Sequence, residues 1–565
     1  MDFKEELINL LAKETKLNQE LVGKLLAVPP DDKLGDYAFP CFQLGKNPKE
    51  EAEKLKARVK LPGFISKVEV SGPYLNFFLD HSILAEKVLS AIYKEAKNYG
   101  KKKIKTKRIV IEYCGPNTNK PLHLGHLRNL SLGNSVCRIL EFVGHEVHPV
   151  NIINDRGIHI SQSMLAYQKW GKNQNPDKKG DHFVGDYYVL FSQRAKENES
   201  LAKEAQQLLV KWENKDKEVI NLWKKMNLWV LDGFKETYAR FGVSFEKEYF
   251  ESAYYDLAKE IVFEGLKSGV FKRDEAGAIY APLEKYGIPD KIVLREDNTS
   301  IYMTQDIYLA KIRFRDFKFD QMIYIVASEQ KLHFQQLFKI LELLGYNFSD
   351  KLYHLSYGLV NLPSGRMKSR EGTVIDADDI MDEVEGLAAI EIKERHERLA
   401  ESEVSKRAKS ISLAAIKFLM LKNDSVKDIV FNPKESMSFE GETGPYLQYT
   451  HARASSILRK AKEENYSVSQ HINFSAFNEE SEIKLLKLLL HFPEIVEKAA
   501  VTHKPHHLAQ YLLSLSQSFN EFYHQLPVIS EDSTVMKARL LLVDGVKQTL
   551  ANGLNLLGID ALEEM

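Results

Sequence analysis

The alternation of hydrophobic and polar residues divides the chain into blocks of different periodicity. Apolar runs at residues 108–113 and 322–327 predict buried strands, and helical patterns separate them. Strands that alternate with helices are typical of a parallel, Rossmann-type nucleotide-binding sheet, which we expect over residues 109–385. Within this block, residues from about 169 to 255 are strongly charged and helical in pattern. They predict a helical insertion between the two halves of the sheet.

The blocks on either side follow other patterns. Residues 386–565 lack strand signals, and apolar positions 543, 546, 550, 554 and 557 form one stripe of a helix, so an all-α bundle is expected. Residues 1–100 mix short helical and strand patterns and predict a small α/β module. The lysine-rich residues 101–108 form a basic link, either a solvated linker or a contact to a phosphate backbone. The predicted fold class is therefore α/β, with a small N-terminal module and a helical C-terminal bundle.

Composition excludes some classes of protein and leaves others open. Among 565 residues, 78 Lys and Arg stand against 79 Asp and Glu, so a nucleic-acid partner must be held by local patches, or is absent. Cys41, Cys114 and Cys137 lack the spacing of a zinc site or a disulfide framework. No signal-peptide pattern and no run of 18 apolar residues occurs. We expect a cytoplasmic protein with no metal site and no membrane role.

The strand at residues 108–113 leads through a polar turn into a helix that opens with two histidines. His123 and His126 lie at i and i+3, on one face of the first helical turn. Unpaired backbone N–H groups and the helix dipole favour an anion there, the imidazoles add donors, and Gly125 lets a ligand approach the backbone. The segment predicts a nucleotide phosphate site; the alternative is two histidines that cap a helix without further function.

This segment resembles the HIGH signature of class I aminoacyl-tRNA synthetases, and the run 117–126 is similar to its arginyl-tRNA synthetase version. The second class I signature, KMSK, aligns with Arg366-Met367-Lys368-Ser369. Ser369 replaces the last lysine, which usually contacts ATP phosphates. Arginyl enzymes that lack this lysine carry another just before the HIGH element, where Lys120 stands. Positive charge can reach the pyrophosphate from either side of the site.

The resemblance assigns roles around ATP, although the basic run at 366–370 taken alone is equally a solvated loop. The implied catalytic residues are His123, His126, Lys120, Lys368 and Arg370. The implied ATP contacts are His123, Gly125, His126, Met367 and Lys368.

An arginine substrate needs carboxylate and amide partners, because a guanidinium presents paired donors that a carboxylate accepts. The resemblance implies arginine contacts at the strand end, in the turn, in a Tyr-x-x-x-Asp element and after the second apolar run, at Glu112, Asn117, Tyr302, Asp306 and Gln330. Taken singly, an aspartate at a helix start is usually a cap, and a glutamine after a strand is usually a turn residue.

The resemblance covers the two ends of the chain as well. Tyr74 and Asn76 of the N-terminal module are implied to touch the elbow of the tRNA. In the anticodon-binding bundle, Tyr449 would stack on a base and Arg453 would contact phosphate. The competing interpretation of Tyr449 is one aromatic residue in a bundle core.

The implied function is arginyl-tRNA synthetase, a monomer that uses ATP with Mg²⁺ to join L-arginine to tRNA(Arg). The interval between residues 126 and 366 leaves little room for a large editing domain, and arginine has few close mimics. A P-loop motif is absent from the sequence. Two alternatives stay open: a non-catalytic tRNA-binding paralogue, suggested by the degenerate 366–369 loop, and a small-molecule adenylyltransferase. Glu112, Lys120 and Asp306 argue against the first, and the helical C-terminal third against the second.

Overall fold

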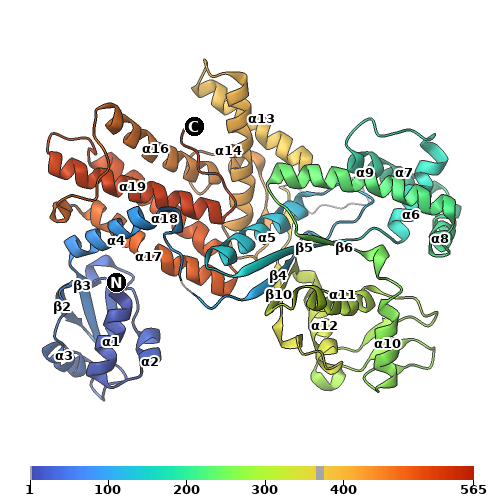
Figure 1. The fold of residues 1–565 in the computed structure, drawn as a ribbon, viewed down its shortest axis with the longest axis horizontal. Coiled ribbons are helices and arrows are strands. Elements are labelled where there is room, and N and C mark those ends of the chain that lie inside the picture. The colour runs from blue at the N-terminus through green and yellow to red at the C-terminus, as the bar shows by residue number, and fades with distance from the viewer. Residues whose placement is uncertain (1–2, 103, 364–374) are drawn as a thin grey trace.

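A five-stranded parallel sheet forms the centre of the molecule (Figure 1). The computed structural model describes residues 3–102, 104–363 and 375–565. Every neighbouring strand pair is parallel, in the order β11-β10-β4-β5-β6. The strands are β4 (Arg108–Glu112), β5 (Glu146–Ile153), β6 (Lys247–Phe250), β10 (Gln321–Ala327) and β11 (Leu352–Tyr357). The parallel sheet expected from the sequence is thus confirmed, and the two predicted strands are neighbours within it.

The strand order reverses between β4 and β10, because the chain runs outward from β4 through β5 to β6 but places β10 and β11 on the other side. Ligands of parallel α/β sheets bind at such a switch point, at the carboxyl ends of the strands. Helices α5 (Leu124–Phe142) and α12 (Lys331–Leu343) begin beyond those ends of β4 and β10, and α11 (Tyr302–Phe317) precedes β10.

Two insertions leave this sheet. The first is a group of helices, α6 (Ile158–Trp170), α7 (Gly180–Glu197), α8 (Ser200–Glu213) and α9 (Lys217–Phe241). The predicted extent of about 169–255 is wrong at its end, because residues 247–250 form β6 and pair with β5. The second insertion was not predicted and consists of α10 (Ala258–Lys267) with an antiparallel sheet of β7 (Lys272–Arg273), β8 (Ile279–Ala281) and β9 (Lys291–Leu294).

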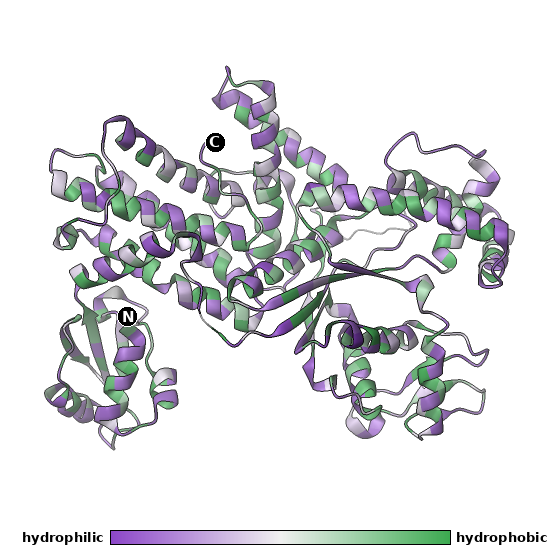
Figure 2. Cartoon of the chain, viewed as in Figure 1, coloured by the Kyte–Doolittle hydropathy of each residue, from purple (hydrophilic) through white to green (hydrophobic). Residues whose placement is uncertain are grey.

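Helices dominate the chain after the sheet, as expected. They are α13 (Ala377–Arg395), α14 (Glu401–Leu421), α15 (Pro433–Ser436), α16 (Gly444–Glu463), α17 (Glu480–Thr502), α18 (His506–Gln525) and α19 (Ser533–Leu556). One short strand, β13 (Ile429–Val430), pairs with β12 (Val360–Asn361). The stripe predicted at 543, 546, 550, 554 and 557 is buried throughout. Figure 2 shows hydrophobic and hydrophilic residues alternating along these helices, which pack their apolar faces together.

The N-terminal module packs beneath the bundle (Figure 1). It contains an antiparallel sheet of β1 (Tyr37–Pro40), β3 (Tyr74–Leu79) and β2 (Ile65–Ser71), with helices α1 (Phe3–Thr15), α2 (Gln19–Leu25), α3 (Pro48–Arg58) and α4 (His81–Glu95). Buried Asp36 ties the module to the bundle, because one carboxylate oxygen accepts from the Leu79 N–H at 2.8 Å and the other pairs with Lys487 of α17 at 2.9 Å.

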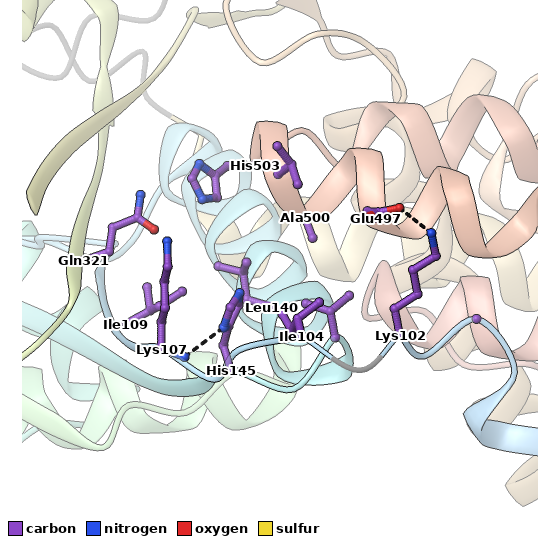
Figure 3. A pocket seen from close by; sticks show the side chains of 13 residues that line it. Lys102, Ile104, Lys107, Ile109, Leu140, His145, Gln321, Glu497, Ala500 and His503 are labelled. Atoms are coloured by element: carbon purple, nitrogen blue, oxygen red, sulfur yellow. Dashed lines mark hydrogen bonds and ion pairs between the residues drawn. The ribbon is translucent and has the colours of Figure 1, made fainter. Parts of the chain in front are cut away.

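Two lysines of the basic link contact neighbouring elements, although most of its described residues are exposed (Figure 3). Lys102 pairs with Glu497 of α17 at 2.7 Å, and the Lys107 N–H donates to Nδ1 of His145 at 3.1 Å. Lys107, His145 and His503 line a cavity of about 250 Å³ where α5 and α17 end. Positive charge is favoured at helix C-termini, which suits Lys107 at this position. Among the described residues, no helix is long and apolar enough to cross a membrane.

Candidate active site

The two histidines of the first helical turn hold each other in place. His123 is the N-cap of α5, and its Nδ1 accepts from the Gly125 N–H at 3.1 Å. Nδ1 of His126 accepts from the His123 N–H at 3.0 Å, and the ring centroids are 4.0 Å apart. Because both Nδ1 atoms accept, each ring carries its proton on Nε2 and presents that N–H as its donor.

Both rings are neutral donors. Burial, with a contribution from the Lys120 ammonium, lowers the pKa of His123 to about 3. Burial also lowers the pKa of His126 well below its usual value. A neutral imidazole still donates through Nε2–H, so the pair can contact a phosphate without a change of charge.

The expectation that backbone N–H groups of this turn stay free for phosphate is wrong. The N–H groups of His123 and Gly125 bond to imidazole nitrogens, that of Leu124 to the Ile375 carbonyl at 3.4 Å, and that of His126 to the His123 carbonyl at 2.7 Å. The histidines therefore take over the donor role that the helix start would otherwise perform.

Gly125 makes this arrangement possible. A Cβ at this position would lie 3.0 Å from Cε1 and 3.1 Å from Nδ1 of His123. A side chain at residue 125 would push the ring away from the backbone that it caps, so the glycine makes room for His123.

Lys120 lies beside this turn and is partly buried. Burial lowers the pKa of its ammonium, and the carboxylate of Asp376 opposes that shift. The chain at Asp376 runs along the helix start, since Asp376 and His123 form an antiparallel bridge and the Ala377 N–H donates to the Leu122 carbonyl at 2.8 Å. The KMSK-like residues Arg366, Met367, Lys368, Ser369 and Arg370 lie outside the described residues.

Glu112 ends β4 and is buried, but it already has a partner within the chain. Its carboxylate pairs with Arg313 of α11, a side chain that is 1% exposed and lies over the rings of Tyr249 and Tyr324. Burial raises the pKa of Glu112, and the Arg313 guanidinium opposes the rise. Because Arg313 offsets its charge, Glu112 offers a substrate guanidinium less attraction than a free carboxylate.

The other predicted arginine contacts lie around the same edge of the sheet. Asp306 accepts from, or shares a proton with, Nε2 of His333 at 2.7 Å, and its charge acts on both Glu112 and Tyr302. Tyr302 is 69% exposed at the start of α11. Exposed Asn117 bridges Asn154 beyond β4, and exposed Gln330 lies just after β10. The structure brings Glu112, Tyr302 and Asp306 close, whereas Asn117 and Gln330 share only the sheet edge.

Sequence reasoning missed Glu251, a further buried acidic residue on which the charge of Asp306 acts. It follows β6, accepts from Gln305 Nε2 at 2.9 Å and lies 3.5 Å from Arg156 NH1. Burial raises the pKa of Glu251 to about 7. Its position at a strand end would have marked it, but β6 itself was not predicted. His333 was missed for another reason. It is distant from Asp306 in the sequence, and the two side chains come into contact only in the folded chain.

The predicted tRNA contacts differ in how far they reach solvent. Tyr74 is 40% exposed and meets Phe42 edge to face, with ring centroids 5.8 Å apart, whereas Asn76 is 3% exposed. Arg453 stacks between Tyr449 and Tyr523, at 4.7 and 5.2 Å from their ring centroids. It also donates to the Tyr449 hydroxyl at 3.0 Å and to Asn520. Tyr449 therefore lies in a partly exposed aromatic cluster on the bundle, and Tyr523 and Asn520 were missed.

Several known proteins are similar to this chain along its whole length. An arginine–tRNA ligase of Treponema denticola is 46% identical, covering 99% of this chain and 98% of the relative. One of Borrelia turicatae is 40% identical, with coverages of 99% and 98%. The solved Thermus thermophilus arginyl-tRNA synthetase superposes with a TM-score of 0.84 at 28% identity, over all of both chains. The Plasmodium falciparum enzyme, at 20% identity and a TM-score of 0.79, shares the fold and covers 100% of this chain and 99% of its own.

Family models divide the chain into three matched parts. The catalytic domain of class I (R) tRNA synthetases matches residues 87–433, the arginyl-tRNA synthetase N-terminal domain residues 1–79, and the DALR anticodon-binding domain residues 447–565. The parallel sheet and the histidine pair at its switch point thus belong to a class I aminoacyl-tRNA synthetase. With matching domains at both ends and relatives that are similar over their full length, the chain belongs to the arginyl-tRNA synthetase family.

Proposed function

We propose that the chain activates L-arginine with ATP and transfers it to tRNA(Arg). A carboxylate oxygen of arginine attacks the α-phosphorus of ATP in line, the bond to the bridging oxygen breaks, and pyrophosphate leaves. The terminal ribose hydroxyl of the tRNA then attacks the arginyl carbonyl, gives up its proton, and AMP leaves. No protein nucleophile is needed, so catalysis comes from positioning and charge.

The observation that carries this proposal is the neutral histidine pair at the sheet's switch point. The Nε2–H groups of His123 and His126 contact the ATP phosphates, and Gly125 keeps the rings against the helix start. Lys120 stabilises the charge that develops on pyrophosphate. By family resemblance, Met367, Lys368 and Arg370 add ATP contacts.

We propose that Asp306 and Tyr302 hold the guanidinium of arginine. The carboxylate of Asp306 contacts His333, whereas that of Glu112 pairs with the buried Arg313. Glu112, with the amide oxygens of Asn117 and Gln330, accepts from the polar backbone end of the substrate.

Mg²⁺ enters with ATP as part of the substrate. Among the described residues, the three-residue cluster with ligand atoms close enough for a metal is Asp181, His182 and Asp378. Lys179 already contacts both of its carboxylates, at 3.0 and 2.7 Å, so this cluster does not suit a resident metal ion.

tRNA contacts are assigned to both ends of the chain. Residues 1–100 contact the tRNA elbow through Tyr74, with Asn76 behind it, and residues 386–565 contact the anticodon through Tyr449 and Arg453. The catalytic residues lie in 109–385. Because one chain holds all these regions, we propose a monomer that acts in the cytoplasm, where tRNA is charged.

ATP–pyrophosphate exchange with each of the 20 amino acids, with and without tRNA(Arg), tests the function. We expect exchange with arginine only, appearing when tRNA is added. Exchange with another amino acid would overturn the pocket assignment. Binding of tRNA(Arg) without exchange under any condition would support the non-catalytic paralogue instead.

A further inference from the structure

A cluster of charged side chains joins the helical insertion to the start of α13. We name it the Asp376–His182 cluster; it consists of Lys179, Asp181, His182, Thr237, Asp376 and Asp378. Asp378 accepts from Lys179 at 2.7 Å, and Lys179 also contacts Asp181 at 3.0 Å and the Thr237 hydroxyl at 2.5 Å. Asp181 is fully buried. The ammonium of Lys179 thus lies between the carboxylates of Asp181 and Asp378.

His182 lies between two carboxylates, that of Asp378 in α13 and that of Asp376 at the N-cap of the same helix. Its Nε2 lies 3.0 Å from Asp378, and its Nδ1 lies 3.4 Å from Asp376. The contact with Asp378 is a hydrogen bond, and the contact with Asp376 is an ion pair when both ring nitrogens are protonated. The hydrogen bond to Asp378 raises the pKa of His182, which favours the doubly protonated form.

The same helix that carries His182 also packs against Lys120. A Cβ at Gly185 of α7 would lie 2.8 Å from Pro121 Cδ and 3.6 Å from Lys120 Cα. Asp376, in turn, bridges His123 through its backbone, and its carboxylate acts on the Lys120 ammonium. Helix α7 therefore packs against the turn that carries Lys120, and its His182 also contacts Asp376, whose backbone pairs with His123.

We propose that His182 is a positioning residue for the activation step: by bridging Asp376 and Asp378, it holds the start of α13 against the turn that carries Lys120 and His123. This inference rests on the proposed role of Lys120. Without the His182 bridge, this segment is held to the turn only through backbone contacts with His123 and Leu122, and the position of Lys120 is less firmly fixed. His182 itself contacts no substrate.

His182→Gln tests the bridge, since an amide spans two carboxylates less well and carries no charge. Arg240→Gln is the matched control. Arg240 also joins the helical insertion to α13, through ion pairs with Asp382 at 2.6 Å and Glu385 at 2.9 Å, but it does not involve Asp376. We expect His182→Gln to lower kcat of arginine-dependent exchange about tenfold, with the arginine KM within about twofold of wild type. Arg240→Gln should leave kcat within about twofold.

A double-mutant cycle identifies the route. If His182 acts through Asp376, His182→Gln should have no further effect in an Asp376→Asn background. Equal effects in both backgrounds would overturn the inference, as would an equal loss in Arg240→Gln.

A second measurement does not depend on activity. A looser segment at Asp376 leaves the partly buried Lys120 more accessible, so acetylation of Lys120 at pH 8, followed by peptide mass spectrometry, should quicken about threefold in His182→Gln. Exposed Lys105 is the internal reference. Unchanged labelling of Lys120 overturns the inference even if wild type exchanges arginine. Absence of exchange in wild type refutes the proposed function, and the labelling result still decides on His182.

Discussion

Nδ1 of His126 accepts a hydrogen bond from the backbone N–H of His123 at 3.0 Å. The bond ties the second histidine of the signature to the cap formed by the first, because His123 itself accepts from Gly125. Each imidazole thereby satisfies a backbone donor of the helix start and is left with one fixed donor, Nε2–H. In the proposed role, the pair offers oriented dipoles that need no reorganisation during the reaction, which is the form of catalysis expected where charge develops on phosphate.

We predict that His123→Asn lowers kcat of arginine-dependent exchange with little change in the arginine KM. The loss should be about 10- to 100-fold, the range for removal of one donor to developing charge. Exposed His471→Asn serves as the control. A change confined to KM would mean that His123 binds ground-state substrate and does not stabilise the transition state.

We predict that Lys120→Ala lowers the activation rate more than tenfold, at least about 1.4 kcal/mol of transition-state stabilisation. In the family, enzymes that lack the last KMSK lysine carry another lysine just before the HIGH element. Ser369 replaces that last lysine here, and Lys120 stands just before the HIGH element. Lys105→Ala, in the basic link, controls for the loss of one positive charge. If Lys368→Ala abolishes exchange while Lys120→Ala leaves the rate unchanged, Lys368 and not Lys120 supplies the positive charge near the pyrophosphate.

The pattern of apolar residues predicted the centre of the fold because β4 and β10 are continuous apolar runs, and the α5 signature follows one of them. It missed β6, whose four residues Lys-Glu-Tyr-Phe carry no such run, and with β6 it missed Glu251 beyond its end. The strands β7, β8 and β9 have two to four residues each, too short for periodicity to register.

The site was predictable where a motif is local and unpredictable where partners meet only in space. Lys120, His123 and His126 lie within seven residues, so one segment defines them. The partner of Glu112 is Arg313, which lies on a helix that follows two insertions in the chain. No sequence spacing predicts that pair. Likewise, the bonding of backbone N–H groups by the imidazoles depends on ring orientation, which periodicity does not specify.

Stability should fall as the pH drops below neutrality, in part through His503. Burial, with His145 and Lys107 nearby, lowers the pKa of His503 to about 4, below its usual 6.5. Between pH 6.5 and 4, His503 is therefore protonated in the unfolded chain but not in the folded chain. The free energy of unfolding declines with falling pH across this window. Above it, the contribution is fully present.

We predict that His503→Asn makes this acid loss shallower, by up to about 1.4 kcal/mol per pH unit within the window. Asparagine suits the left-handed backbone at residue 503, where φ is 54°. Urea unfolding at pH 7.5, 6 and 5 measures the slope, with His471→Asn as the control. An identical slope in wild type and His503→Asn would show that His503 binds protons equally in the folded and unfolded chains, which would contradict the lowered pKa.

The last prediction concerns tRNA binding by the cluster of Tyr449, Arg453 and Tyr523. Within the described residues, Arg453 contacts two aromatic rings, a hydroxyl and the Asn520 amide, all neutral, so its positive charge remains available to phosphate. Tyr449→Ala should weaken tRNA binding by about 1–3 kcal/mol through lost stacking, and Tyr449→Phe should retain most of the affinity.

Arg453→Gln should weaken binding and also reduce the slope of log affinity against log salt by about 0.7, the value for one contact to a single-stranded phosphate. Exposed Lys272→Ala, on the small antiparallel sheet, should leave both affinity and slope unchanged. Filter binding of tRNA(Arg) at several salt concentrations separates the two roles. If Arg453→Gln weakens binding at an unchanged slope, Arg453 holds Tyr449 in place and does not contact phosphate, because removal of a phosphate contact must alter the number of counterions released.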